Sequence, residues 1–161
     1  MMQTGKILVA EEQGSFVLKM IGDVRLTLCT SLDHYLDEMF ANPNFNDVVI
    51  DLSEAENVDS TTLGQMAKLA IKAKDLYQHI PSIVSTKPSI TRVLESMCFD
   101  KVFKIKHKLP ENDAELKALC DCPPDEAEMK PCILEAHRVL MGLSNENEAK
   151  FKELVNELEA S

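Results

Sequence analysis

A carboxylate followed by three hydroxyls, Asp59-Ser60-Thr61-Thr62, is the segment best suited to chemistry. It follows the apolar run 47–52 and precedes a helical pattern, and Asp and Ser both favour the N-cap of a helix. A helix N-terminus offers unpaired N–H groups and a positive dipole end, so it accommodates a phosphate. Phosphorylation there would add about −1.5 to −2 charges without melting the helix. Taken locally, an Asp-Ser pair is more often an ordinary cap.

A second group combines thiols with an imidazole: Cys120-x-Cys122, Cys132 and His137. Thiolate and imidazole are zinc ligands, but zinc sites usually have roughly two to four residues between paired cysteines. The single intervening residue here is a poor match. We therefore predict no metal site and interpret these cysteines as incidental thiols.

The patterns of common catalytic sites are absent from the sequence. There is no G-x-S-x-G, no H-E-x-x-H and no P-loop, and the five glycines are not clustered. Four histidines lie far apart in the sequence, none beside a candidate nucleophile: His34, His79, His107 and His137. We therefore predict a protein that is not an enzyme and needs no cofactor.

The elements that must position Ser60 follow from the hydrophobic pattern. Strands and helices alternate over residues 1–120, which predicts an α/β domain with a mostly parallel sheet and one antiparallel hairpin. In the first half of the domain we predict strands over 6–11 and 15–21 joined by a Gln13-Gly14 turn, a helix capped by Thr30 or Ser31 that ends before Asn42-Pro43, a strand over 47–52 and a long helix after Ser60. A strand over 80–85 follows, and then a helix from Pro88 with a buried stripe of Ile90, Val93, Leu94 and Met97. The domain is predicted to end with a strand over 101–106 and a short helix that contains Leu116 and Leu119 and is capped by Asn112 or Asp113.

The chain continues beyond this domain. Residues 121–131 are rich in proline and acidic residues and are predicted to form a linker. Residues 132–161 show two short helical patterns, the second with Asn145 and Glu148 as a capping pair, and are predicted to form a helical hairpin. These helices have too little apolar surface to stand alone, so they must pack on the domain, pair with another copy or fold on a partner. We expect packing on the domain, with partner contact as the second choice.

Composition restricts the classes of partner. Apolar residues make up 45% of the 161 residues, which is enough for a packed core. Residues 1–110 carry 12 Lys/Arg and 14 Asp/Glu, whereas residues 111–161 carry 5 and 13, so most of the net charge of −10 lies in the tail. Such an acidic chain is poorly suited to nucleic acid. The absence of a signal peptide or long apolar segment, with an odd number of cysteines, predicts a cytoplasmic location without membrane insertion.

Two blocks of the sequence resemble the STAS domain family, which includes the bacterial anti-sigma-factor antagonists. The first is Val48-Val49-Ile50-Asp51-Leu52 followed by Asn57-Val58-Asp59-Ser60-Thr61-Thr62-Leu63-Gly64, which resembles the family's apolar strand, short loop and Asp-Ser-(Ser/Thr)-Gly-Leu-Gly. The second is Lys87-Pro88-Ser89-Ile90-Thr91-Arg92-Val93-Leu94 followed by Phe99-Asp100-Lys101-Val102-Phe103-Lys104-Ile105, which resembles the family's next helix and last strand.

The Gly22-Asp23 pair also fits the family's turn after its second strand. The resemblance covers roughly residues 5–120 and implies the STAS fold, a mixed sheet packed with helices. Thr62 departs from the pattern, because the family often has Gly there. The Asp-Ser-Thr-Thr-Leu-Gly variant with an acidic tail is similar to antagonists of gamma-proteobacteria that control motility, secretion or biofilm formation.

The resemblance implies particular site residues. Ser60 would be the phosphorylation site and Thr61 the alternate acceptor, supported by Asp59, Thr62 and Gly64. The implied partner-binding residues are Asp23, Asn57, Gln65, Lys68 and Lys72, and the last three, with Lys74, are expected on the exposed rim of the helix after Ser60.

The implied function is that of a switch. The unphosphorylated protein would bind an anti-sigma factor or an equivalent regulator, a serine kinase using ATP and Mg²⁺ would turn this binding off, and a serine phosphatase would restore it. One alternative is a non-switching STAS subunit of a larger assembly, such as a transporter-associated complex. Another is a metal- or thiol-dependent enzyme built on the cysteines. The pattern predicts no particular oligomeric state.

Overall fold

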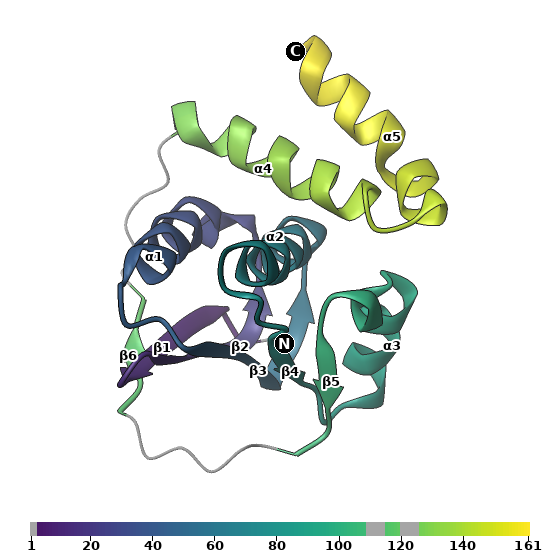
Figure 1. Cartoon of the computed structure of the whole chain (residues 1–161). Coiled ribbons are helices and arrows are strands. Elements are labelled where there is room, and N and C mark those ends of the chain that lie inside the picture. The colour runs from purple at the N-terminus through teal and green to yellow at the C-terminus, as the bar shows by residue number, and fades with distance from the viewer. Residues whose placement is uncertain (1–2, 109–114, 120–125) are drawn as a thin grey trace.

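The computed structural model describes residues 3–108, 115–119 and 126–161. Within them the strands form one mixed sheet of six, in the order β5-β4-β3-β2-β1-β6. Helices α1 (Cys29–Ala41) and α2 (Ser60–Tyr77) lie on one face of the sheet, and α3 (Pro88–Ser96) lies beside β5 (Figure 1). The strands are β1 (Lys6–Glu12), β2 (Ser15–Val24), β3 (Asp47–Val58), β4 (Ser82–Val84), β5 (Lys104–Lys106) and β6 (Lys117–Ala118), and two 3₁₀ turns are η1 (Leu26–Leu28) and η2 (Phe99–Lys101).

The pairing of the strands confirms the predicted mixed sheet. Strands β1 and β2 form an antiparallel hairpin, whereas β2, β3, β4 and β5 run parallel to their neighbours. The hairpin turns at Gln13 and Gly14, where the backbone φ angles are +52° and +85°. Glycine is required at position 14 because a Cβ there would lie 1.8 Å from the carbonyl oxygen of Asn44.

Strand β3 is longer than the apolar run 47–52 predicts. It continues to Val58 and pairs with β2 up to Val24, after two register shifts in the pairing. The acidic residues Glu54 and Glu56 conceal this extension in the sequence, because their exposed side chains alternate with buried ones. The strand therefore ends directly before Asp59, with no loop between β3 and α2.

The core lies mainly between the sheet and the helices α1 and α2. Its fully buried members include Leu18 and Met20 of β2, Ile50 of β3, Leu36 of α1 and Met66 of α2. Leu18, Met20 and Ile50 fall in the predicted strands, and Leu36 and Met66 fall in the predicted helices. On α3 the predicted stripe is only partly correct, since Ile90, Leu94 and the adjacent Met97 are buried but Val93 is 38% exposed.

Two predictions within the domain are wrong, the caps of α1 and the short helix around Leu116. Thr30 and Ser31 do not cap α1, because both lie inside the helix, whose N-cap is Leu28 without a side-chain hydrogen bond. The predicted short helix around Leu116 is replaced by β6, which pairs antiparallel with β1 at the edge of the sheet. Backbone pairing with an open edge here outweighs a weak helical pattern. The predicted caps Asn112 and Asp113 lie outside the described residues.

The C-terminal extension consists of helices α4 (Glu126–Met141) and α5 (Asn145–Ala160). Helix α4 begins inside the predicted linker, so residues 126–131 are helical, including Pro131. Residues 121–125 of that linker lie outside the described residues. The cap of α5 is Ser144, whose side chain accepts a hydrogen bond from the Asn147 N–H, and not the predicted pair of Asn145 and Glu148.

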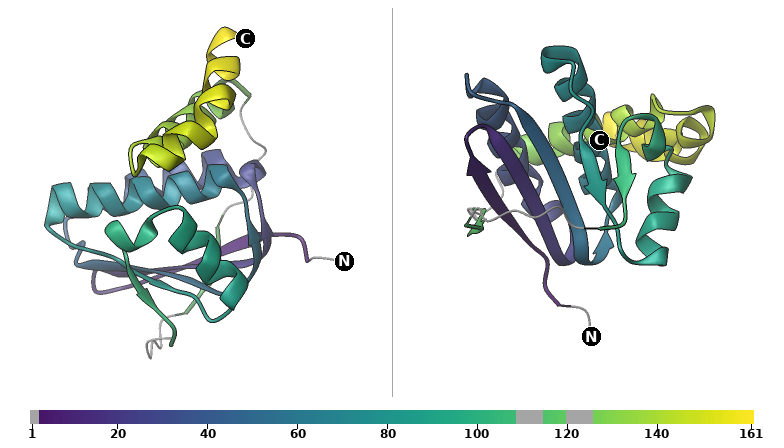
Figure 2. Two further views of the ribbon diagram at one scale, coloured as in Figure 1. Left: turned by 90° about the vertical axis from the view of Figure 1, so that its right-hand side faces the viewer. Right: turned by 60° about the horizontal axis from the view of Figure 1, so that its bottom comes forward.

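The extension packs on the domain, as predicted. Helix α4 crosses α1 and α2 on the side away from the sheet, and α5 lies beside α4 (Figures 1 and 2). Leu140 of α4 and Phe151 of α5 join the buried core cluster. In the part of the chain that the structure describes, no helix has the length and apolar character needed to cross a membrane.

Candidate functional site around Ser60

Ser60 is the first residue of α2, and Asp59 is the N-cap of that helix. One carboxylate oxygen of Asp59 accepts the Thr62 N–H at 2.9 Å, which confirms the predicted cap. The other oxygen accepts the Leu26 N–H at 2.6 Å. Asp59 therefore fixes the start of α2 to the 3₁₀ turn that precedes α1, and so determines where Ser60 lies.

The Ser60 hydroxyl forms a hydrogen bond with a histidine of the extension. Its Oγ lies 2.9 Å from Nε2 of His137 on α4, and Nδ1 of His137 lies 2.8 Å from the carbonyl oxygen of Ile133. Because a carbonyl oxygen only accepts, Nδ1 carries a proton, and in the neutral ring Nε2 accepts the hydroxyl proton of Ser60. The imidazole is 2% exposed and packs edge-on against Phe151.

The expectation that no histidine stands beside a candidate nucleophile is therefore wrong. Ser60 and His137 are 77 residues apart, and local spacing carries no sign of their contact. Chemically, a neutral imidazole at this distance can take up the hydroxyl proton and raise the nucleophilicity of the oxygen. The group that orients the imidazole is a backbone carbonyl, where serine hydrolases have a carboxylate.

The other predicted hydroxyls are buried. Thr61 is 2% exposed and Thr62 is 1% exposed. Thr61, predicted as an alternate phosphate acceptor, is thus inaccessible in this arrangement, whereas Ser60 is half-buried. The β-branched Thr62 fits inside the first turn of α2 and donates its N–H to Asp59.

Gly64 allows the extension to approach α2 closely. A Cβ at position 64 would lie 2.2 Å from the carbonyl oxygen of Ala136 and 2.7 Å from its Cβ. Any side chain at this position would therefore push α4 away from α2. Gly64, a predicted support of the Ser60 site, contributes by having no side chain that would keep α4 away from α2.

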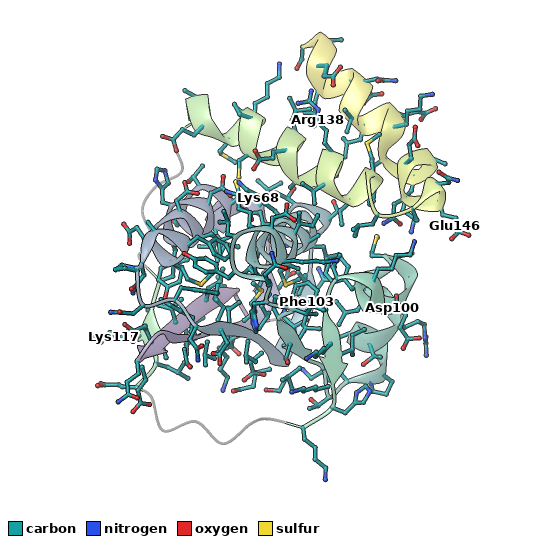
Figure 3. The ribbon with its side chains drawn as sticks, viewed as in Figure 1. Lys68, Asp100, Phe103, Lys117, Arg138 and Glu146 are labelled. Carbon is teal, nitrogen blue, oxygen red and sulfur yellow. The ribbon has the colours of Figure 1, made fainter. Side chains whose placement is uncertain are left out.

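Gln65 does not lie on an exposed rim, as predicted, because α4 covers it. Its side chain is 1% exposed and its Nε2 donates to the Cys29 carbonyl oxygen at 2.6 Å and contacts Sγ of Cys132 at 3.4 Å. The same change affects Lys68, which lies near α4 (Figure 3). Its Nζ lies 3.1 Å from Asp33 of α1 and pairs with Glu135 of α4. Burial alone would lower the pKa of Lys68, but hydrogen bonds and charges of Glu135 and Asp33 raise it above its ordinary value.

Of the remaining predicted partner-binding residues, Asn57 is exposed and Lys72 is partly exposed, whereas Asp23 keeps only 13% of its side chain exposed. Lys72 keeps 40% of its side chain exposed and lies 3.7 Å from Asp37. Asp23 and Asn57 face each other across β2 and β3, with Nδ2 of Asn57 donating to Asp23 at 3.0 Å. The hydrogen bond from Asn57, followed by the neighbouring Arg25, lowers the pKa of Asp23. This pair lies near the C-terminal ends of β2 and β3, close to the start of α2.

The structure describes three of the five cysteines. Cys120 and Cys122 lie outside the described residues, and among the described residues Cys29, Cys98 and Cys132 are free thiols. Cys29 and Cys132 are buried between α1 and α4, where the hydrogen bond with Cys29 and burial both raise the pKa of Cys132. The described residues contain no group of three or more side chains able to hold a metal ion.

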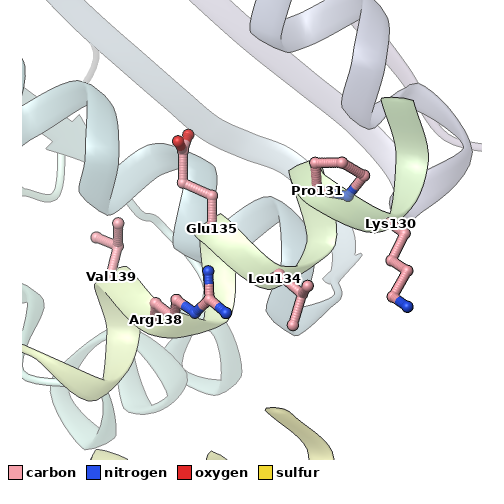
Figure 4. A pocket seen from close by; sticks show the side chains of 6 residues that line it. All are labelled: Lys130, Pro131, Leu134, Glu135, Arg138 and Val139. Atoms are coloured by element: carbon pink, nitrogen blue, oxygen red, sulfur yellow. The ribbon is translucent and has the colours of Figure 1, made fainter. Parts of the chain in front are cut away.

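A depression on α4 is lined by Lys130, Pro131, Leu134, Glu135, Arg138 and Val139 (Figure 4). Its charged side chains are engaged within the chain. Arg138 pairs with Glu159 of α5 at 2.6 Å, Glu135 pairs with Lys68, and Lys130 donates to the Ser161 carbonyl oxygen. Each charged side chain of the depression therefore already has a partner within the chain.

Comparison with known proteins agrees with this architecture. The family model of the STAS domain matches residues 6–112. An anti-sigma factor antagonist from Mycobacterium paratuberculosis superimposes with a TM-score of 0.55 at 23% identity, over 66% of this chain and 88% of the other. The protein TM1081, solved by NMR, gives a TM-score of 0.55 at 19% identity, over 62% of this chain and 79% of the other. The match spans β1 to β5, Ser60 and α1 to α3 but ends before β6 and α4, and the chain belongs to the STAS domain family.

Proposed function

We propose that this protein is an anti-sigma-factor antagonist that acts in the cytoplasm as a binding module, without catalytic activity or a cofactor. The observation that carries the proposal is Ser60 itself, a half-buried hydroxyl at the first position of α2 in a STAS domain. The similar structure from Mycobacterium paratuberculosis bears the name of an anti-sigma factor antagonist, which supports the same role here.

In this proposal, the unphosphorylated protein binds an anti-sigma factor or an equivalent regulator. A serine kinase phosphorylates Ser60, and a serine phosphatase removes the phosphate. The phosphate adds about −1.5 to −2 charges at the centre of the interface. Burying that charge without a cation costs several kcal/mol, roughly a hundredfold or more in affinity. The N-terminus of α2 tolerates the phosphate, so the switch does not unfold the domain.

The residues proposed to contact the partner surround Ser60. Asn57 and Asp23 present polar groups at the edge of the sheet, and Lys72 extends the surface along α2. Lys68 and Gln65 belong to the same face but are covered by α4. Neutral and basic groups thus predominate on α2, which suits an anti-sigma factor with an acidic contact surface.

One observation favours a second candidate, a non-switching STAS subunit of a larger assembly. The hydroxyl of Ser60 is already bonded to the buried His137, and a serine with a purely structural role would show the same bond. In that case Ser60 would hold α4 in place and would not be phosphorylated.

The test is a pull-down from cell extract with the Ser60→Ala and Ser60→Asp forms of the full chain, read by mass spectrometry. The antagonist proposal expects the Ala form to retain an anti-sigma factor that the Asp form loses. Equal retention of the same proteins by both forms would contradict the switch and favour the subunit. Ser89→Asp, an equal change at the exposed start of α3, controls for the added charge.

A further inference from the structure

We propose that helix α4 occupies the partner-binding face around Ser60 as a built-in competitor, and that the partner presents an amphipathic helix that takes its place. This inference rests on the proposed function, because the competitor and the partner use the same face. Helix α4 lies outside the region that matches the STAS family, so it is an addition to the domain and not one of its own layers.

The first support is the close backbone contact between α4 and α2. The Ala136 carbonyl lies so near Gly64 that no side chain fits between them. Cys132, Ala136 and Leu140, spaced by four residues, form the buried stripe of α4 against the domain. The face therefore accepts a helix whose central residue is small, and α4 provides such a helix.

The second support is a set of polar contacts between individual residues of α2 and α4. Ser60 donates to the imidazole of His137, and Lys68 pairs with Glu135. These contacts use the same residues, Ser60 and Lys68, that the proposed function assigns to partner binding. A competing helix is expected to place a hydrogen-bond acceptor over Ser60 and a carboxylate over Lys68, beside a small residue over Gly64.

The third support is that the arrangement with α4 bound, here called the closed form, leaves a buried polar atom unsatisfied and shares one of its ion pairs with α1. Among the described residues, Oε1 of Gln65 is buried without a hydrogen-bond partner, on a side chain whose Nε2 contacts Cys132 of α4. Such an atom opposes closure, because water would satisfy it once α4 moves away. The Lys68 contact is also shared, since Asp33 of α1 remains beside Lys68 when Glu135 leaves.

Competition within one chain lowers the apparent affinity of the partner by the fraction of molecules that are open. A change that loosens α4 without altering the α2 face should therefore strengthen partner binding. The same change should expose the thiols of Cys29 and Cys132, which are buried between α1 and α4. Cys132 reports this movement, because its side chain is buried against Gln65 and Cys29 in the closed form.

The experiment measures the rate at which N-ethylmaleimide labels Cys132 in the full chain, resolved by peptide mass mapping. Two variants loosen α4: Ala136→Glu puts a carboxylate against Gly64, and Glu135→Lys turns the Lys68 pair into a repulsion at an exposed position. The matched control is Glu153→Lys, the same charge reversal on the exposed side of α5. Both loosening variants should raise the labelling rate about tenfold, and the control should not.

The decisive arm adds the anti-sigma factor retained by Ser60→Ala. Its binding should speed the labelling of Cys132 in the wild-type chain, and both loosened variants should bind it at least about threefold more tightly than the control. If the factor binds while Cys132 stays as protected as in the free protein, the proposed function stands and this inference is overturned. If no anti-sigma factor is retained by either Ser60 form, the proposed function fails and the inference fails with it.

Discussion

The Ser60 hydroxyl donates a hydrogen bond to Nε2 of His137 at 2.9 Å, and this bond joins the start of α2 to the buried side of α4. Nδ1 of the same ring is held by the Ile133 carbonyl, so the ring cannot turn to offer a proton to Ser60 without losing that bond. With the imidazole neutral, the contact depends on a proton that Ser60 gives. A phosphate ester at Ser60 has no such proton.

Replacement of Ser60 by aspartate should therefore loosen α4. A carboxylate is an acceptor only, so it meets the accepting nitrogen of the neutral imidazole of His137 and adds a charge at this part-buried position, at a cost of about 1–3 kcal/mol. We expect backbone amides of α4 to exchange roughly tenfold faster or more by hydrogen–deuterium exchange and mass spectrometry. Ser60→Ala removes only the hydrogen bond and should have a smaller effect. Equal protection of α4 in all three proteins would show that this bond does not hold the helix.

A methyl group at position 64 should also displace α4. In Gly64→Ala, the new Cβ would meet the Ala136 carbonyl oxygen at 2.2 Å, so the backbone of α4 must shift. The gain in helix propensity, about 1 kcal/mol at most, is smaller than the overpacking cost of roughly 1–3 kcal/mol. The expected result is a net loss of stability in urea unfolding.

Gly142→Ala is the matched control for that substitution. Its Cβ would have the Val139 carbonyl oxygen at 3.4 Å as nearest neighbour, an ordinary contact. We expect its urea midpoint to stay near that of the wild type. If both alanine variants unfold alike, the close approach of α4 to Gly64 contributes nothing to stability.

The sequence predicts the domain well where the hydrophobic pattern is local. The hairpin, β3 and α2 follow from apolar runs and turn residues, and Asp59 is recognisable as a cap from its type and place. The hydrophobic pattern does not predict an element whose structure is decided by backbone pairing with a distant strand. The edge strand β6 exists because β1 leaves an edge to pair with, and the two residues Lys117 and Ala118 have no strand pattern of their own.

The covering of the site could not be predicted, because it depends on contacts between distant segments. Gln65 and Lys68 look like an exposed polar rim when α2 is read alone, but contacts with both α1 and α4 cover them. One indirect sign was present: an interior glycine, Gly64, on the same helix as Gln65 is consistent with close approach of another backbone. That sign does not identify which segment approaches.

His34 should give the docking of α4 a pH dependence. Its Nε2 lies 2.8 Å from Glu128 of α4, and this hydrogen bond, together with the charges of Glu128, Asp37 and Asp33, raises the pKa of His34 above its usual value of about 6.5. A raised pKa means that the contribution is complete below the unfolded-state pKa and is lost as pH rises through the folded-state pKa. We expect the advantage in melting temperature of wild type over His34→Gln at pH 6 to shrink by pH 8.

Both partners are exposed, so salt should weaken this contact. The difference between wild type and His34→Gln at pH 6 should decrease when the ionic strength is raised. A difference that is constant from pH 6 to pH 8 would mean that the charge of His34 plays no part.

Asp59 should be the most sensitive residue of the Ser60 site to substitution, because each of its oxygens serves a different element. In Asp59→Ala, α2 loses its cap and the Leu26 N–H loses its acceptor, so we expect about 2 kcal/mol or more of lost stability. Asp59→Asn keeps one accepting oxygen and should lose less. Urea unfolding of the three proteins measures this order. If Asn destabilises as much as Ala, the negative charge at the helix N-terminus, and not the second acceptor, is what the fold requires.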